Sequence, residues 1–226
     1  QDLPRGLATW SLTLSLPLQL HQPPYTVYCT EDKEATVYEE EQCHVWRSST
    51  TRLLPISAFA LAVGRWTPLS LGPGLRLATP SLNTNALLGR YLRAALKAAS
   101  SLLGHPHPEP RLDLVVVHRS FSGLGLCSPA LIFLSPSLLA GDPALLIKLA
   151  HEVTHAWFGL AIGAEDWAEQ WLSEGFATFL EDSIHDLVLE ELGLPRHRQL
   201  VGLRAINRFL QLEEEVSCSR SELQEL

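Results

Sequence analysis

The 226-residue sequence contains no methionine, not even at position 1, and it has few cysteines. Because a natural start codon is missing, we expect the sequence to be a piece of a longer product. The cysteines form no CxxC pair and no dense framework, which argues against a disulfide-stapled secreted fold. Reduced thiols are typical of intracellular proteins, and we expect the cytoplasm in preference to the nucleus. The cysteines are Cys29, Cys43, Cys127 and Cys218.

Long apolar runs and an excess of basic residues are also absent. No run of about 20 apolar residues occurs, so no transmembrane helix is predicted. The opening QDLPRGLATW lacks the basic and apolar regions of a signal peptide. Lys and Arg number 17 against 25 Asp and Glu, a formal net charge of -8. This balance predicts neither a nucleic-acid partner nor an anionic membrane surface. No pattern indicates an oligomeric state.

The first 66 residues have the patterns of β-strands. Residues 9–18 alternate between polar and apolar, as a half-buried strand does. Residues 58–63 are apolar at every position, which predicts a strand buried on both faces. Residues 67–80 are rich in proline and glycine and are predicted to connect two domains.

From residue 81 onward the apolar residues recur mainly at helical spacing. Three helices are predicted at 83–104, 143–159 and 168–192, with buried strands at 112–117 and 130–134. The sequence therefore predicts an α+β fold. The end of a β-rich N-terminal domain, residues 1–66, precedes a second domain, residues 81–226, that we expect to be incomplete at its C-terminus.

The segment HEVTHAWFG, which begins at His151, carries a metal-binding pattern. His151 and His155 lie about one helical turn apart, so both imidazoles can bind one ion at about 2.0–2.1 Å. Glu152 points roughly 100° around the helix, where it can reach a water on that ion. Glu174 follows His155 by nineteen positions on the next predicted helix and can supply a third ligand. Two histidines, a carboxylate and an open position predict one catalytic Zn²⁺.

Three other side chains enter hypotheses about this site. Glu181 lies two turns beyond Glu174, either as an acceptor that fixes the tautomer of a ligand histidine or as a solvated helix residue; both interpretations stay open. Cys127 with His118 could form a cysteine hydrolase, although no residue that would orient the base is visible. With zinc, Glu152 would take a proton from the metal-bound water and pass it to the leaving amine.

The segments HEVTHAWFG and WLSEGFA resemble the gluzincin aminopeptidases, peptidase family M-one. SLLAGD at residues 137–142 resembles the aminopeptidase B-like branch, and LPISAFALAVG at 54–64 resembles the last strand of the family's N-terminal domain. The resemblance implies that residues 81–226 are the zinc-bearing half of a thermolysin-like catalytic domain. It also implies a zinc-dependent aminopeptidase that acts on peptides with a free N-terminus. The implied site residues are the zinc ligands His151, His155 and Glu174 and the general base Glu152.

The sequence departs from the family at three points. The family motif Gly-X-Met-Glu-Asn, whose Glu holds the substrate amine, aligns with the segment around Gly125 and Cys127. Cys127 occupies the Glu position, and a neutral thiol cannot pair with an ammonium as a carboxylate does. Leu160 replaces the usual Asn, and no tyrosine follows Glu174 to stabilise the transition state. We therefore keep an alternative, a catalytically weak or inactive isoform that binds zinc and peptides.

Overall fold

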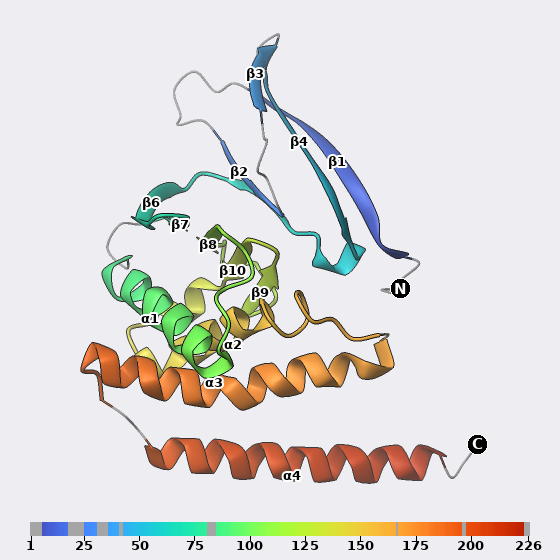
Figure 1. Ribbon diagram of the computed structural model, residues 1–226, viewed down its shortest axis with the longest axis vertical. Coiled ribbons are helices and arrows are strands. Elements are labelled where there is room, and N and C mark those ends of the chain that lie inside the picture. The colour runs from blue at the N-terminus through green and yellow to red at the C-terminus, as the bar shows by residue number, and fades with distance from the viewer. Residues whose placement is uncertain are drawn as a thin grey trace.

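The computed structural model describes residues 6–17, 25–30, 36–40, 43–80, 85–165, 167–195 and 198–223. Long antiparallel strands form one end of the molecule, and the helices cluster at the other end (Figure 1). The mixture of sheets and helices confirms the expected α+β class. None of the helices in these ranges combines the length and apolar composition that crossing a bilayer requires.

The N-terminal part contains two small antiparallel sheets. In the first, β4 (Cys43–Leu54) pairs with both β1 (Ala8–Pro17) and β3 (Thr36–Glu40). In the second, β2 (Thr26–Cys29) pairs with β5 (Leu61–Gly64). Side chains of β1 alternate between exposed and half-buried, as its sequence pattern predicts.

The strand predicted at residues 58–63 differs from the one observed. Ile56–Ala58 form a single 3₁₀ turn, and β5 begins only at Leu61. Val63 in β5 is 40% exposed, so the strand is not buried on both faces. An all-apolar run shows that a segment is suited to a core, but the neighbouring elements decide how much of it is covered.

A five-stranded sheet forms the centre of the molecule. Its order is β6 (Thr67–Gly72), β7 (Leu75–Thr79), β8 (Leu112–Val116), β10 (Leu131–Leu134) and β9 (Gly125–Ser128). β7, β8 and β10 are parallel, whereas β6 and β9 are antiparallel edge strands. This arrangement puts β9 at one edge of the sheet, where its residues Gly125 and Cys127 line a pocket.

Residues 67–80, which are predicted to connect two domains, contain two strands of the central sheet. They form the hairpin of β6 and β7, which belongs to the same sheet as β8. Their glycines serve the turn: Gly74 has φ +70°, and a β-carbon there would overlap the carbonyl oxygen of Pro110. Proline and glycine mark tight turns as well as linkers, and only pairing with β8 distinguishes the two cases here. The boundaries of the domains stay predictions.

Both faces of the central sheet are buried. Helix α1 (Asn85–Leu103) covers one face together with α2 (Ile147–His155) and α3 (Gln170–Leu192). The core on this side includes Leu77, Leu114 and Ile132 from the sheet and Leu88, Tyr91, Leu92, Leu149 and Val153 from the helices. On the other face, Tyr28 and Ala60 of the N-terminal part pack against Val115 and Phe133. The sheet thereby fixes the N-terminal part against the helices.

Helix α4 (Arg198–Leu223) runs alongside α3 on the side away from the sheet (Figure 1). Its apolar side chains are mostly exposed, among them Leu203, Ile206, Phe209, Leu210 and Leu212. Glu213, Glu214 and Glu215 are also exposed.

Candidate metal centre

A 3₁₀ turn with a capped N-terminus precedes the helix that carries His151 and His155. The Asp142 side chain accepts a hydrogen bond from Ala144 N at 2.9 Å, and Pro143 opens a 3₁₀ turn that leads into α2. Leu149, Ala150 and Val153 of α2 are fully buried. Their burial holds the helix rigidly, with the two histidines on the face that borders a pocket.

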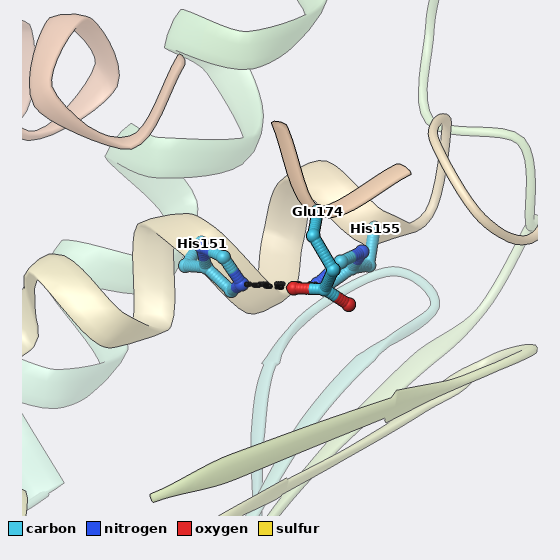
Figure 2. A group of neighbouring side chains, drawn as sticks. All are labelled: His151, His155 and Glu174. Carbon is cyan, nitrogen blue, oxygen red and sulfur yellow. Dashed lines mark hydrogen bonds and ion pairs between the residues drawn. The ribbon is translucent and has the colours of Figure 1, made fainter. Parts of the chain in front are cut away.

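Three donor groups converge between α2 and α3, as Figure 2 shows. The Nε2 atoms of His151 and His155 lie 3.0 Å apart. Glu174 Oε2 lies 3.4 Å from His151 Nε2 and 3.6 Å from His155 Nε2. Helical spacing within α2 brings the histidines together, and the packing of α3 on α2 adds the carboxylate. The structure thus brings together the three ligands that the sequence predicts.

The hydrogen bonds of the two rings determine which nitrogens are free. His155 Nδ1 lies 3.0 Å from the carbonyl oxygen of Phe158, which can only accept, so Nδ1 carries the proton. The Nε2 lone pair of the neutral ring therefore points at His151. His151 Nδ1 lies 2.8 Å from Glu181 Oε2, although its N–H is turned away from the line to that oxygen. The Nε2 atoms of the two rings lie next to each other and to Glu174.

Two unprotonated Nε2 atoms and a carboxylate at these distances repel one another unless a cation or a proton lies among them. Burial disfavours the imidazolium of His151, but Glu174, Glu181 and Glu152 outweigh this and raise its pKa to about 9. The neighbouring His151 and His155 in turn hold the pKa of Glu174 well below its usual range. A site that attracts a positive charge so strongly, with two imidazoles and one carboxylate, fits Zn²⁺.

Glu181 is fully buried, which excludes the interpretation as a solvated helix residue. Its Oε2 faces His151 Nδ1 at 2.8 Å and Lys148 Nζ at 3.4 Å. Its Oε1 contacts the guanidinium of Arg208 from α4. The structure therefore supports the other interpretation, in which Glu181 lies beside a candidate ligand histidine.

Glu152 lies on the same helix but points to the edge strand β9. Its side chain is 8% exposed and packs over Gly125, where a β-carbon would lie 2.6 Å from Glu152 Cδ. Glycine at this position is therefore what leaves room for the carboxylate. Burial raises the pKa of Glu152, while the histidines oppose the shift. A carboxylate with a raised pKa is a stronger base than a solvated one.

His151, Glu152, His155 and Glu174 line one pocket of about 610 Å³. Gly125 and Cys127 line it from β9, opposite the histidines, and Arg52 and Leu53 line it from β4. Ser128, next in β9, is buried and donates to the carbonyl oxygen of Ala58 at 2.7 Å, which anchors the strand to the N-terminal part. The pocket thus lies between the metal-binding helices and the N-terminal strands.

The thiol of Cys127 does not have the properties of a nucleophile. Burial, and then the nearby carboxylate of Glu152, raises its pKa well above the usual range, so the thiol stays protonated. His118, the partner in the cysteine-hydrolase interpretation, is exposed, and its Nδ1 lies 2.9 Å from Ser120 Oγ. The structure therefore argues against the cysteine-hydrolase interpretation.

Sequence reasoning missed two charged residues at the site. Arg52 lines the pocket and pairs with Glu109, and Arg208 reaches Glu181 from a helix that the sequence marks only as polar and solvated. The one signal in the sequence is the spacing of Arg204 and Arg208, four apart on one helical face. That signal names no partner, because the contacts are made across more than twenty residues of chain.

Comparison with known proteins agrees with this geometry. Human aminopeptidase O is 32% identical over 275 aligned residues, which cover 100% of this chain and 33% of that protein. Mouse aminopeptidase RNPEPL1 is 33% identical over 186 residues, which cover 81% of this chain and 25% of that protein. The structure of yeast LTA4 hydrolase in complex with bestatin matches 84% of this chain and 28% of its own, with a TM-score of 0.62 and 20% identity.

The structural match at this identity concerns the fold alone. The chain spans a third or less of the length of these relatives. A family model described as the peptidase family M1 domain matches residues 91–217, which include both histidines, Glu152 and Glu174. The resemblance noted in the sequence is thereby confirmed, and the chain belongs to peptidase family M1.

Proposed function

We propose that this chain is part of a zinc-dependent aminopeptidase that hydrolyses the N-terminal peptide bond of peptides. One Zn²⁺ per chain would be held by His151, His155 and Glu174. The observation that carries the proposal is the convergence of these three groups beside a buried Glu152 in one large pocket. Membership of peptidase family M1 and relatives named aminopeptidases support the same activity.

The residues of this chain have distinct parts in the proposed reaction. Zn²⁺, when bound, would act as a Lewis acid that makes water a nucleophile near neutral pH and polarises the substrate carbonyl. Glu152 would act as the general base that accepts a proton from the attacking water and passes it to the leaving amine. Its burial over Gly125 supports this part, because desolvation makes the carboxylate more basic. Glu181 Oε2, 2.8 Å from His151 Nδ1, would orient the ring so that Nε2 faces the metal.

The substrate would lie between β9 and the histidines. Gly125 and Cys127 line this side of the pocket and are proposed to contact the N-terminal end of the peptide. The protonated thiol of Cys127 gives the ammonium no ionic partner. Glu174, whose carboxylate is 54% exposed, can share that task with its part in metal binding. We expect the substrate amine to be held more weakly than by a dedicated carboxylate.

A second candidate is a zinc-binding, peptide-binding isoform that is catalytically weak or inactive. It is favoured by the thiol at Cys127, which stands where the family motif has a carboxylate. The pocket itself would still accept a peptide.

Metal content and turnover together distinguish these candidates. We would measure zinc by atomic absorption and the hydrolysis of aminoacyl fluorophores by the 226-residue chain, its Glu152→Gln variant and a Glu191→Gln control. Glu191 is an exposed acid on the same α3 helix as Glu174. One zinc per chain with turnover that only Glu152→Gln abolishes supports the enzyme. Zinc without turnover supports the second candidate, and a chain that binds no zinc overturns both.

A further inference from the structure

Glu181 is a fully buried carboxylate in contact with a candidate metal ligand. An ionised carboxylate in such a position requires charged or hydrogen-bonding partners, because burial removes its hydration. Its partners decide in which orientation the carboxylate is held. The residue that compensates Glu181 therefore acts indirectly on His151.

Two cationic side chains contact Glu181, and their contacts differ in distance and geometry. Lys148 Nζ lies 3.4 Å from Oε2, the oxygen that also faces His151. Arg208 contacts the other oxygen, Oε1, and its Nη1 also donates to Asp182 Oδ2 at 2.7 Å. The planar guanidinium thereby bridges two successive carboxylates on α3, with a geometry that an ammonium cannot reproduce.

Helix α4 presents arginines to α3 in place of apolar side chains. Among the α4 side chains that the structure describes, the partly buried ones are Val201, Arg204 and Arg208. Arg204 donates twice to Asp182 Oδ1, at 2.7 and 3.0 Å, but does not reach Glu181 in these contacts. The large apolar residues Leu203, Ile206 and Phe209 of α4 are exposed. Ion pairs with Glu181 and Asp182, more than apolar burial, thus determine how α4 is seated.

We propose that Arg208 is a positioning residue for the metal centre. Arg208 fixes the orientation of the Glu181 carboxylate through its contact with Oε1. Glu181 Oε2 lies 2.8 Å from His151 Nδ1 and in turn orients the ring, so that Nε2 faces the proposed metal. The position of α4 on α3 is thereby coupled to the affinity of the proposed site for the metal. This inference rests on the proposed metal site at His151, His155 and Glu174.

Zinc affinity, measured by competition with a chromogenic chelator, tests this coupling. Removing an outer-shell partner typically weakens metal binding by about 10–100-fold. We expect Arg208→Met to weaken zinc binding about ten-fold and Arg208→Lys to weaken it less. Arg204→Met is the matched control, since it removes an ion pair between the same two helices without touching Glu181, and it should bind zinc as the unmodified chain does. With Co²⁺ in place of zinc, only the Arg208 variants should change the visible absorption spectrum.

A second measurement needs no metal. In the metal-free chain, the denaturation midpoints of Arg208→Met, Glu181→Gln and the double variant should be non-additive, because the two residues share one interaction. The same cycle with Arg204→Met should be closer to additive. Circular dichroism would verify that each variant is folded, and Arg208→Lys replaces any variant that is not.

The possible results separate this inference from the proposed function. If the unmodified chain binds no zinc, the metal site and the inference both fail. If it binds zinc and Arg208→Met binds equally well, the metal site stands and the inference is overturned. Equal weakening by Arg204→Met and Arg208→Met would also overturn it, since the cause would then be the loss of α4 as a whole. Additive midpoints in the Arg208 and Glu181 cycle would contradict the contact itself.

Discussion

The carboxylate of Glu152 packs directly against the backbone of Gly125, on an edge strand that is far away in the sequence. Any β-carbon at residue 125 would occupy the space that the carboxylate fills. The position of the proposed general base thus depends on the absence of a side chain in β9. This relationship leads to the first prediction.

Gly125→Ala should displace the Glu152 carboxylate into the pocket. Because Glu152 is buried and its Cγ as well as its carboxylate lies at the contact, the strain cannot be relieved by a small rotation. We expect peptide hydrolysis to fall at least about ten-fold, and overpacking to cost about 1–3 kcal/mol of unfolding free energy. Gly163→Ala is the control, since Gly163 lines the same pocket and a β-carbon there meets nothing closer than 3.9 Å. Equal rates for the two variants would contradict this account of Gly125.

Metal removal should destabilise the chain. If His151, His155 and Glu174 hold zinc in the folded state only, zinc at about 100 times its dissociation constant adds about 2.7 kcal/mol of stability. A chelator such as EDTA should therefore lower the melting temperature of the unmodified chain, while Glu174→Gln should show a much smaller difference with and without zinc. Glu191→Gln, an exposed change on the same helix, should respond as the unmodified chain does. A melting temperature independent of zinc would contradict the metal site.

Stability should fall in mild acid because of His185. His185 is buried, and its Nδ1 lies 2.6 Å from the hydroxyl of Tyr91. Burial, and then Arg204, lower the pKa of His185 to about 4. Since the unfolded chain takes up the proton near pH 6.5 and the folded chain only near 4, His185 contributes its full stability above about pH 6.5. That contribution is lost as the pH falls toward 4, by on the order of 2–3 kcal/mol.

The His185→Gln variant measures this effect. Its unfolding free energy, obtained from urea titrations between pH 4 and 7, should depend less on pH than that of the unmodified chain. His105→Gln is the control, because His105 lies in an exposed turn and should leave the pH dependence unchanged. Parallel pH profiles for His185→Gln and the unmodified chain would show that His185 does not stay neutral in the fold.

Arg76→Met should destabilise the central sheet. Arg76 of β7 forms two hydrogen bonds of 2.6 Å with Asp113 of β8, and Asp113 is 2% exposed. Removing the partner of a buried charge costs about 3–5 kcal/mol, although Arg111 at 3.5 Å from Asp113 should reduce the loss. Lys97→Met removes the exposed pair with Glu191, where about 0–1 kcal/mol is expected. Equal losses in urea denaturation would contradict the importance of the buried pair.

Much of the metal site can be inferred from the sequence, because its two histidines are local. Their spacing on one helix determines their geometry before any tertiary contact forms. The third ligand could also be anticipated, since Glu174 follows on the next helix and matches a family pattern. The cap at Asp142 and Pro143 was predictable for the same local reason.

The structures of two segments could not be read from their composition, because they depend on contacts with distant parts of the chain. The hairpin of residues 67–80 resembled a linker because its turn requires glycine, and only pairing with β8 makes it part of the sheet. The apolar run at 58–63 predicted a fully buried strand, but Val63 has no covering layer in the part of the chain that the structure describes. In both cases the composition was compatible with two outcomes, and packing selected one.

The sequence by itself determined the α+β class, the family and the three candidate ligands, because helical period and motif spacing are properties of short segments. Tertiary structure alone decided that Glu181 is buried against His151, that Glu152 packs over Gly125, and that Arg208 completes the network from α4. These contacts join residues from separate elements. Their energies come from desolvation and close packing, which exist only once the elements have assembled.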